Sequence, residues 1–180
     1  MNPMPKRIFL TGFMGCGKTH SARHLAEAMG IPFIDLDDYI EEKQGKTIAA
    51  IFAEEGEEAF RNIEANALRT AGQAEQFIMA TGGGSPCFHQ NMDWMNQRGK
   101  TIYLKAPAWL LQGRLVHQTS KRPLLAQRSP EELLQFIETK LLERESYYAK
   151  AQLIFYLQKV EQKNLEDLIG ELKKIVGVQP

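Results

Sequence analysis

Disulfides, long apolar runs and a dominant charge are all missing from this chain of 180 residues, and each absence excludes a class of protein. The two cysteines, Cys16 and Cys87, are too few for the disulfide framework of a small secreted domain. No apolar run approaches the roughly 20 residues that cross a bilayer. The polar start, residues 1–7, leads into only a brief apolar run, so we expect no signal peptide. We therefore expect a cytoplasmic protein with no membrane partner.

The charges balance. Lysine and arginine number 22, as do aspartate and glutamate, so the formal net charge is zero. This balance argues against a chain whose main role is to coat nucleic acid, and we expect no nucleic-acid partner. Any anionic partner must instead meet a local cluster of cations. A content of 43% hydrophobic and 24% charged residues is typical of a globular protein, and we expect a single domain over residues 1–180. We also expect a monomer, although composition does not report the oligomeric state.

Short apolar runs alternate with stretches of helical periodicity, and there is no internal repeat or linker. This alternation is typical of βαβ units and predicts an α/β fold, with three layers, α/β/α, around a five-stranded parallel sheet. A final helix is expected from Asn164. The predicted strands are residues 8–10, 33–34, 77–80, 101–104 and 153–157, the second of them buried.

Capping residues mark where the helices begin and end. Gly30 is a natural stop for the helix after the first strand. Thr47 can cap one short helix, and Gly56 separates that helix from the next. Pro107 suits the first turn of a helix, and Ser129-Pro130-Glu131-Glu132 forms a capping box that opens another.

Residues 12–19, Gly-Phe-Met-Gly-Cys-Gly-Lys-Thr, fit the pattern G-x-x-x-x-G-K-[ST] at every fixed position. Glycines let the backbone wrap closely around a phosphate, and the helix that follows favours negative charge at its N-terminus. Lys18 supplies a point charge for the β- and γ-phosphates, and Cys16 occupies a variable position as a small filler rather than a nucleophile. We expect ATP as the co-substrate of this phosphate loop, with contacts from Gly15, Cys16, Gly17, Lys18, Thr19 and His20.

Mg²⁺ is the expected cofactor, and it needs oxygen ligands near the phosphates. The Thr19 hydroxyl is one. The strand that ends at Ala80 runs into Thr81 and glycines, whereas the strand that ends at Ile34 leads to Asp35. We therefore assign Thr19 and Asp35 to the metal, with Asp35 acting through water. The alternative is that Asp35 only caps the next helix.

The phosphate loop identifies the nucleotide but not the phosphate acceptor. No Asn-Lys-x-Asp run, which reads guanine in GTPases, occurs in the sequence. Four motifs follow the loop in order: Asp35-Leu36-Asp37, Gly56-Glu57-Glu58-Ala59-Phe60-Arg61, Thr81-Gly82-Gly83-Gly84 and Arg122-Pro123-Leu124-Leu125. They are followed by Arg144, four residues before Tyr148.

With this combination the chain resembles the shikimate kinase family, from Arg7 to about Tyr156. The resemblance implies a P-loop NTPase fold of the nucleoside monophosphate kinase type, with a mobile lid at about 118–128. It implies transfer of phosphate from ATP to the 3-hydroxyl of shikimate, a step of chorismate and aromatic amino-acid biosynthesis. A substrate-binding helical segment would lie at about 37–71.

The resemblance also implies roles for single residues on the acceptor side. Asp37 would bind the reacting hydroxyls, and the backbone of Gly82, Gly83 and Gly84 would line the pocket. Arg61 and Arg144 would hold the shikimate carboxylate, a task that suits the planar, bidentate guanidinium. Arg61 is also expected to pair with Glu57 one helical turn earlier. Whether Asp37 takes the proton or only aligns the hydroxyl is left open.

Lys18, Asp37 and Arg122 would form the catalytic set. Arg122 would be the lid arginine that closes over the transferring phosphate, and Arg114 matches the adenine-stacking arginine of the family. Two alternatives remain. One is a kinase of another polyol acid, such as gluconate, and the other is a nucleotide-binding module without catalysis.

Overall fold

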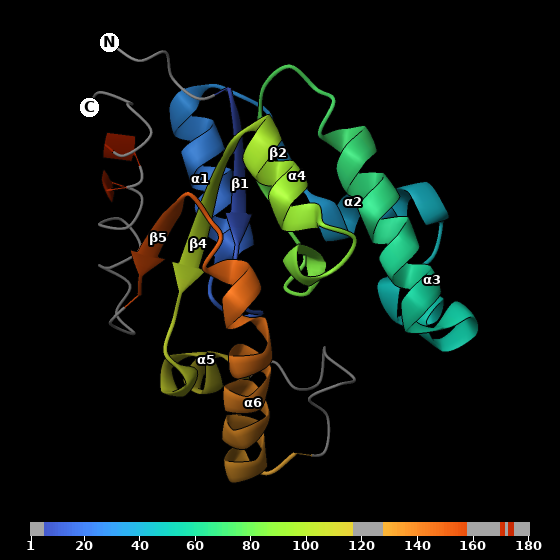
Figure 1. Cartoon of the computed structure of the whole chain (residues 1–180), viewed down its shortest axis with the longest axis vertical. Helices are drawn as coiled ribbons and strands as arrows, with labels where there is room; N and C mark the ends of the chain where they lie inside the picture. Colours follow the sequence, from blue (N-terminus) through green and yellow to red (C-terminus); the bar gives the residue numbers. More distant parts are fainter. Residues whose placement is uncertain (1–5, 117–127, 158–169, 172, 175–180) are drawn as a thin grey trace.

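Five parallel strands form one sheet in the computed structural model, which describes residues 6–116, 128–157, 170, 171, 173 and 174 (Figure 1). The neighbouring strands all pair in parallel, and each boundary lies within one residue of the predicted one. The predicted five-stranded parallel sheet is therefore confirmed. In order across the sheet, the strands are β2 (Phe33–Asp35), β3 (Phe77–Ala80), β1 (Arg7–Thr11), β4 (Lys100–Lys105) and β5 (Leu153–Tyr156).

Alternate side chains of the strands enter two separate cores, which makes the predicted three layers. Ile8 and Leu10 pack with α1, α5 and α6, whereas Phe9 packs with α2, α3 and α4. Figure 1 shows α3 standing on the opposite side of the molecule from β5. The helices are α1 (Lys18–Met29), α2 (Leu36–Gln44), α3 (Ile48–Ala71), α4 (Asn91–Arg98), α5 (Ala108–Leu115) and α6 (Pro130–Tyr148), with a 3₁₀ turn, η1 (Ser85–Cys87).

Four of the predicted signals, at Gly30, Thr47, Gly56 and Ser129, act as expected. Gly30 ends α1 in the left-handed conformation, with φ 64°, and Thr47 accepts a hydrogen bond from the Ala50 amide at the start of α3. Gly56, with φ 83° and ψ 175°, kinks α3 between its two helical parts. Ser129 forms the complete capping box with Glu132 at the start of α6.

Three local expectations need correction. β2 is half-buried rather than buried, because it is an edge strand with a neighbour on one side only. Pro107 precedes α5 as its N-cap instead of occupying the first turn. Helix α4 was not expected, because most of its residues are polar; only a narrow stripe that includes Met92 and Met95 enters the core.

The lid expected at about 118–128, with Arg122, lies outside the described residues except for Arg128. Most of the helix expected from Asn164 lies outside them as well. Within the described part, no helix is long and apolar enough to cross a bilayer.

The packing of α3, the helix that carries Arg61, against the core can be tested by substitution. Leu68 on α3 is fully buried. We expect Leu68→Ala to lower the free energy of unfolding by about 2–5 kcal/mol, because a cavity adds to the lost transfer free energy. The control is Leu142→Ala on α6, where the side chain is 82% exposed and the expected change is within about 0.5 kcal/mol. Urea denaturation measures both, and equal losses would contradict the assigned packing.

Candidate functional site

The candidate site lies at the carboxyl ends of β1, β2 and β3. The chain leaves β1 toward the layer of α1 and leaves β3 toward the layer of α4, so the two connections diverge between adjacent strands. Open parallel sheets bind ligands at such a point. A cavity of about 390 Å³ opens there. Its lining includes the phosphate loop, Asp35 and Asp37 of the β2–α2 junction, Arg61 of α3 and Arg144 of α6.

The phosphate loop joins β1 to α1, as its motif predicted. Gly12, Gly15 and Gly17 all have positive φ, and a Cβ on Gly12 would lie 2.7 Å from the Leu104 carbonyl oxygen. These positions therefore need glycine. Lys18 Nζ donates hydrogen bonds to the Gly12 carbonyl at 2.9 Å and the Phe13 carbonyl at 3.1 Å, so the ammonium lies across the loop.

Asp35 performs two tasks with its two carboxylate oxygens. Its Oδ1 accepts the Asp37 amide at 3.0 Å and so caps α2. Its Oδ2 accepts the Thr19 hydroxyl at 2.7 Å. Capping and proximity to Thr19 are therefore compatible. A hydroxyl and a carboxylate beside a phosphate loop fit Mg²⁺, which commonly takes few protein ligands and completes its shell with phosphate and water.

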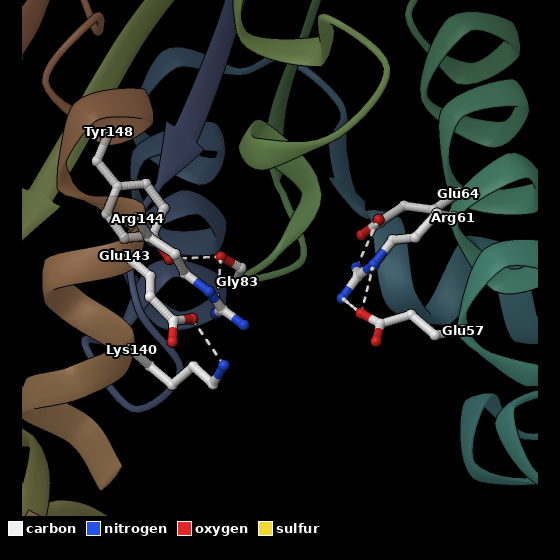
Figure 2. Close-up of polar contacts among 8 residues, drawn as sticks. All are labelled: Glu57, Arg61, Glu64, Gly83, Lys140, Glu143, Arg144 and Tyr148. Atoms are coloured by element: carbon white, nitrogen blue, oxygen red, sulfur yellow. Dashed lines mark hydrogen bonds and ion pairs between the residues drawn. The ribbon is translucent and has the colours of Figure 1, made fainter. Parts of the chain in front are cut away.

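Arg61 is held on both sides by carboxylates (Figure 2). Its Nη2 lies 3.0 Å from Glu57 Oε1, the predicted partner, and its Nη1 lies 2.8 Å from Glu64 Oε2. The guanidinium carbon lies 4.3 Å from the centre of the Phe88 ring, at cation–π distance. The guanidinium is thus fixed in position before any ligand binds.

Glu64 is the acceptor-side residue that the sequence argument missed. Its side chain is 1% exposed. Burial raises the pKa of Glu64, with a smaller contribution from Asp37, while the Arg61 guanidinium opposes the shift. The only sign of this contact in the sequence is that Glu64 follows Arg61 by three residues. The same spacing also occurs between Arg and Glu on exposed helix faces, so it does not show that Glu64 is buried.

The triple glycine allows charged groups to approach the backbone closely. A Cβ on Gly82 would lie 2.6 Å from Glu64 Oε1 and 3.0 Å from Asp37 Oδ1. A Cβ on Gly84 would lie 2.7 Å from Arg61 Nη2. The expected role of this turn as a backbone wall of the pocket is therefore sterically consistent.

Arg144 reaches the turn from the other side. Its Nη1 donates a hydrogen bond to the Gly83 carbonyl at 3.3 Å, and its guanidinium carbon lies 5.5 Å from the centre of the Phe13 ring. Figure 2 shows the guanidinium groups of Arg61 and Arg144 pointing toward one another from α3 and α6. Residues more than 80 positions apart in sequence are thereby brought to one cavity.

The remaining predicted residues belong to the nucleotide side. Arg114 Nη1 donates to the carbonyls of Gly15 at 3.3 Å and Cys16 at 3.1 Å, and so contacts the phosphate loop. His20 lines the same cavity; burial lowers its pKa, and the neighbouring His24 adds to the effect. Cys16 is buried, consistent with a filler.

The shikimate kinase family model matches residues 14–174. The chain belongs to the shikimate kinase family. The shikimate kinase of Parabacteroides distasonis is 45% identical over 172 residues, which cover 95% of this chain and 99% of that protein. The resemblance predicted from the motif order is thereby confirmed.

Solved shikimate kinases share the fold. The crystal structure of the Bacteroides thetaiotaomicron enzyme has a TM-score of 0.91 and 39% identity, covering 96% of this chain and 99% of that one. The Acinetobacter baumannii enzyme, solved in complex with shikimate, has a TM-score of 0.83 and 36% identity, covering 97% and 94%. The fold predicted for this kinase, that of the nucleoside monophosphate kinases, is confirmed.

Cys87, which follows the glycine turn and feels the charges of Arg144 and Arg61, provides a test of the electrostatics near this kinase site. Burial raises the pKa of its thiol to about 11, although Arg144 and Arg61 oppose the shift. At pH 8 the thiolate fraction should be about a hundredth of that of an ordinary cysteine, because the pKa is raised from 9.0 to about 11. We expect iodoacetamide to alkylate Cys87 correspondingly slowly in the native protein and rapidly in urea, measured by mass spectrometry. Fast native alkylation would contradict this assignment.

Proposed function

We propose that this kinase transfers the γ-phosphoryl group of ATP to the 3-hydroxyl of shikimate, with Arg61, Arg144 and Asp37 binding the acceptor. The observation that carries the proposal is the facing pair of guanidinium groups across a cavity whose lining also includes the phosphate loop. Family membership supports the same activity. The Acinetobacter baumannii neighbour, solved with shikimate, supports the acceptor.

The shikimate carboxylate suits the two arginines. Arg61 donates from Nε and Nη2 to Glu57 and from Nη1 to Glu64, which occupies three of its five N–H groups. After these bonds within the described part of the chain, one N–H on each terminal nitrogen remains for a ligand. Two such N–H groups match the two oxygens of a carboxylate, and Arg144 adds a second cation.

The ring hydroxyls are assigned to Asp37 and to the backbone of residues 82–84. Phosphoryl transfer passes through a loose transition state, so alignment and charge neutralisation supply most of the rate. Asp37 lies on the first turn of α2, two residues after the Asp35 cap, and lines the cavity. It would align the 3-hydroxyl with the γ-phosphate and can accept its proton late in the step.

The nucleotide is assigned to the phosphate loop, from Gly15 to His20, with Lys18 at the phosphates. Arg114, which bonds the Gly15 and Cys16 carbonyls, would stack on the adenine. Mg²⁺ would be held by Thr19 and, through water, by Asp35, and when bound it would neutralise phosphate charge. Arg122 is proposed to close over the transferring phosphate from the lid at about 118–128.

We assign shikimate binding to the segment at about 37–71 within a single domain that spans residues 1–180. We expect the protein to be a monomer in the cytoplasm. A kinase of gluconate or a module without catalysis is not favoured, since the family match covers residues 14–174 and the acceptor-side motifs are complete.

The acceptor is tested by titration with Mg²⁺-ATP in excess and ADP release as the readout. We expect ADP to form in proportion to added shikimate and to stop when EDTA removes Mg²⁺. Gluconate, which offers a carboxylate and hydroxyls on an open chain, is the matched control and should give no ADP above the background. Turnover that responds to gluconate but ignores shikimate would remove the proposal.

The carboxylate contact is tested by Arg61→Lys. Lysine keeps the charge near Glu57 and Glu64 but lacks the planar fork. We expect shikimate binding to weaken by about 1.5–3 kcal/mol, or roughly tenfold to a hundredfold, while ATP affinity hardly changes. Calorimetric titrations with each substrate separate the two affinities. An equal loss of both would show that Arg61 only supports the fold.

A further inference from the structure

Tyr148, the last residue of α6, makes a buried contact that the reaction as described above does not use. The side chain is fully buried. Its hydroxyl donates a hydrogen bond to the Gly83 carbonyl at 2.5 Å, across 65 positions of sequence (Figure 2). Burial raises the pKa of the Tyr148 phenol well above its usual range, so the group remains an O–H donor at any working pH.

The Gly83 carbonyl is therefore held by two donors from the same helix. One is the Tyr148 hydroxyl, and the other is Arg144 Nη1 at 3.3 Å. Tyr148 lies one helical turn after Arg144, so both side chains project from the same face of α6. The shorter bond belongs to the residue that cannot itself reach solvent, whereas Arg144 lines the cavity.

Gly83 also lies against the phosphate loop. A Cβ on Gly83 would lie 3.2 Å from the Met14 amide nitrogen and 3.6 Å from the Gly12 carbonyl oxygen. The middle residue of the glycine turn is thus wedged between α6 and the nucleotide side of the site. Any shift of this residue changes the spacing between the acceptor pocket and the phosphate loop.

We infer that Tyr148 is a positioning residue for the acceptor: its hydroxyl fixes the Gly83 carbonyl and so leaves the Arg144 guanidinium available for the carboxylate of the substrate. The inference rests on the proposed function. Without the hydroxyl, Arg144 would be the only side chain described here that donates to this carbonyl. Because the half-buried carbonyl would then have lost its shorter hydrogen bond, Arg144 would be drawn toward Gly83 and away from the ligand.

The test is Tyr148→Phe, which keeps the aromatic ring and removes one hydroxyl. We expect KM and Kd for shikimate to rise about three- to tenfold, the range for one neutral hydrogen bond. The KM for ATP should stay within about twofold, because the phosphate loop keeps its own contacts. Steady-state kinetics and calorimetry measure these constants, and thermal denaturation records whether the variant is folded.

Tyr103→Phe is the matched control. Tyr103 is equally buried, and its ring packs against that of Tyr148 in a tilted arrangement with centroids 4.9 Å apart. Its hydroxyl donates instead to Glu145 Oε2 at 3.1 Å. Removing it should lower thermal stability to a similar degree but leave the KM for shikimate within about twofold.

A double-mutant cycle tests whether Tyr148 affects shikimate binding through Arg144. In an Arg144→Ala background, Tyr148→Phe should raise the Kd for shikimate clearly less than in the wild type, because Arg144 is the residue through which it acts. Equal effects of Tyr148→Phe and Tyr103→Phe, parallel losses for ATP and shikimate, or full additivity with Arg144→Ala would each overturn the inference. Those results leave wild-type shikimate turnover intact. A wild type without such turnover is the separate result that removes the proposed function, and the inference with it.

Discussion

Charged side chains approach the backbone of residues 82–84 so closely that the turn has no space for side chains of its own. A Cβ atom would meet Glu64 Oε1 at 2.6 Å from Gly82 and Arg61 Nη2 at 2.7 Å from Gly84. Because the turn carries no side chains, its backbone and the neighbouring guanidinium and carboxylate groups line the same cavity. The acceptor pocket depends on this close approach.

Burying the Arg61–Glu64 ion pair costs desolvation free energy, so the pair is a poor source of stability. Both partners are largely buried, and burial raises the pKa of Glu64 despite its cationic neighbour. Buried ion pairs contribute little net stability, because desolvation offsets much of the attraction between the charges. What the pair provides is a guanidinium with a fixed orientation, held between Glu57, Glu64 and the Phe88 ring. Pre-organisation of this kind lowers the entropy lost when a rigid acid binds.

Much of the fold could be predicted because its signals are local. The strand boundaries followed from short apolar runs, and Gly30, Thr47, Gly56 and Ser129 acted at the predicted positions. Helix α4 was missed because it buries only a narrow stripe of its surface, so its sequence has little periodicity to detect. The half-buried β2 was misjudged because an apolar pair of residues does not reveal whether its strand lies at the centre or the edge of a sheet.

The candidate site divides in the same way. The sequence by itself determined the phosphate loop, the pairing of Arg61 with Glu57 and the family, since each depends on residues at fixed spacing along the chain. Only the tertiary structure decided that Glu64 is buried and that Tyr148 reaches Gly83. It also decided that Arg61 and Arg144 face one another. Burial and cross-chain contacts depend on how α3, α6 and the glycine turn pack around one cavity, and the spacing of residues within a single helix contains no information about that packing.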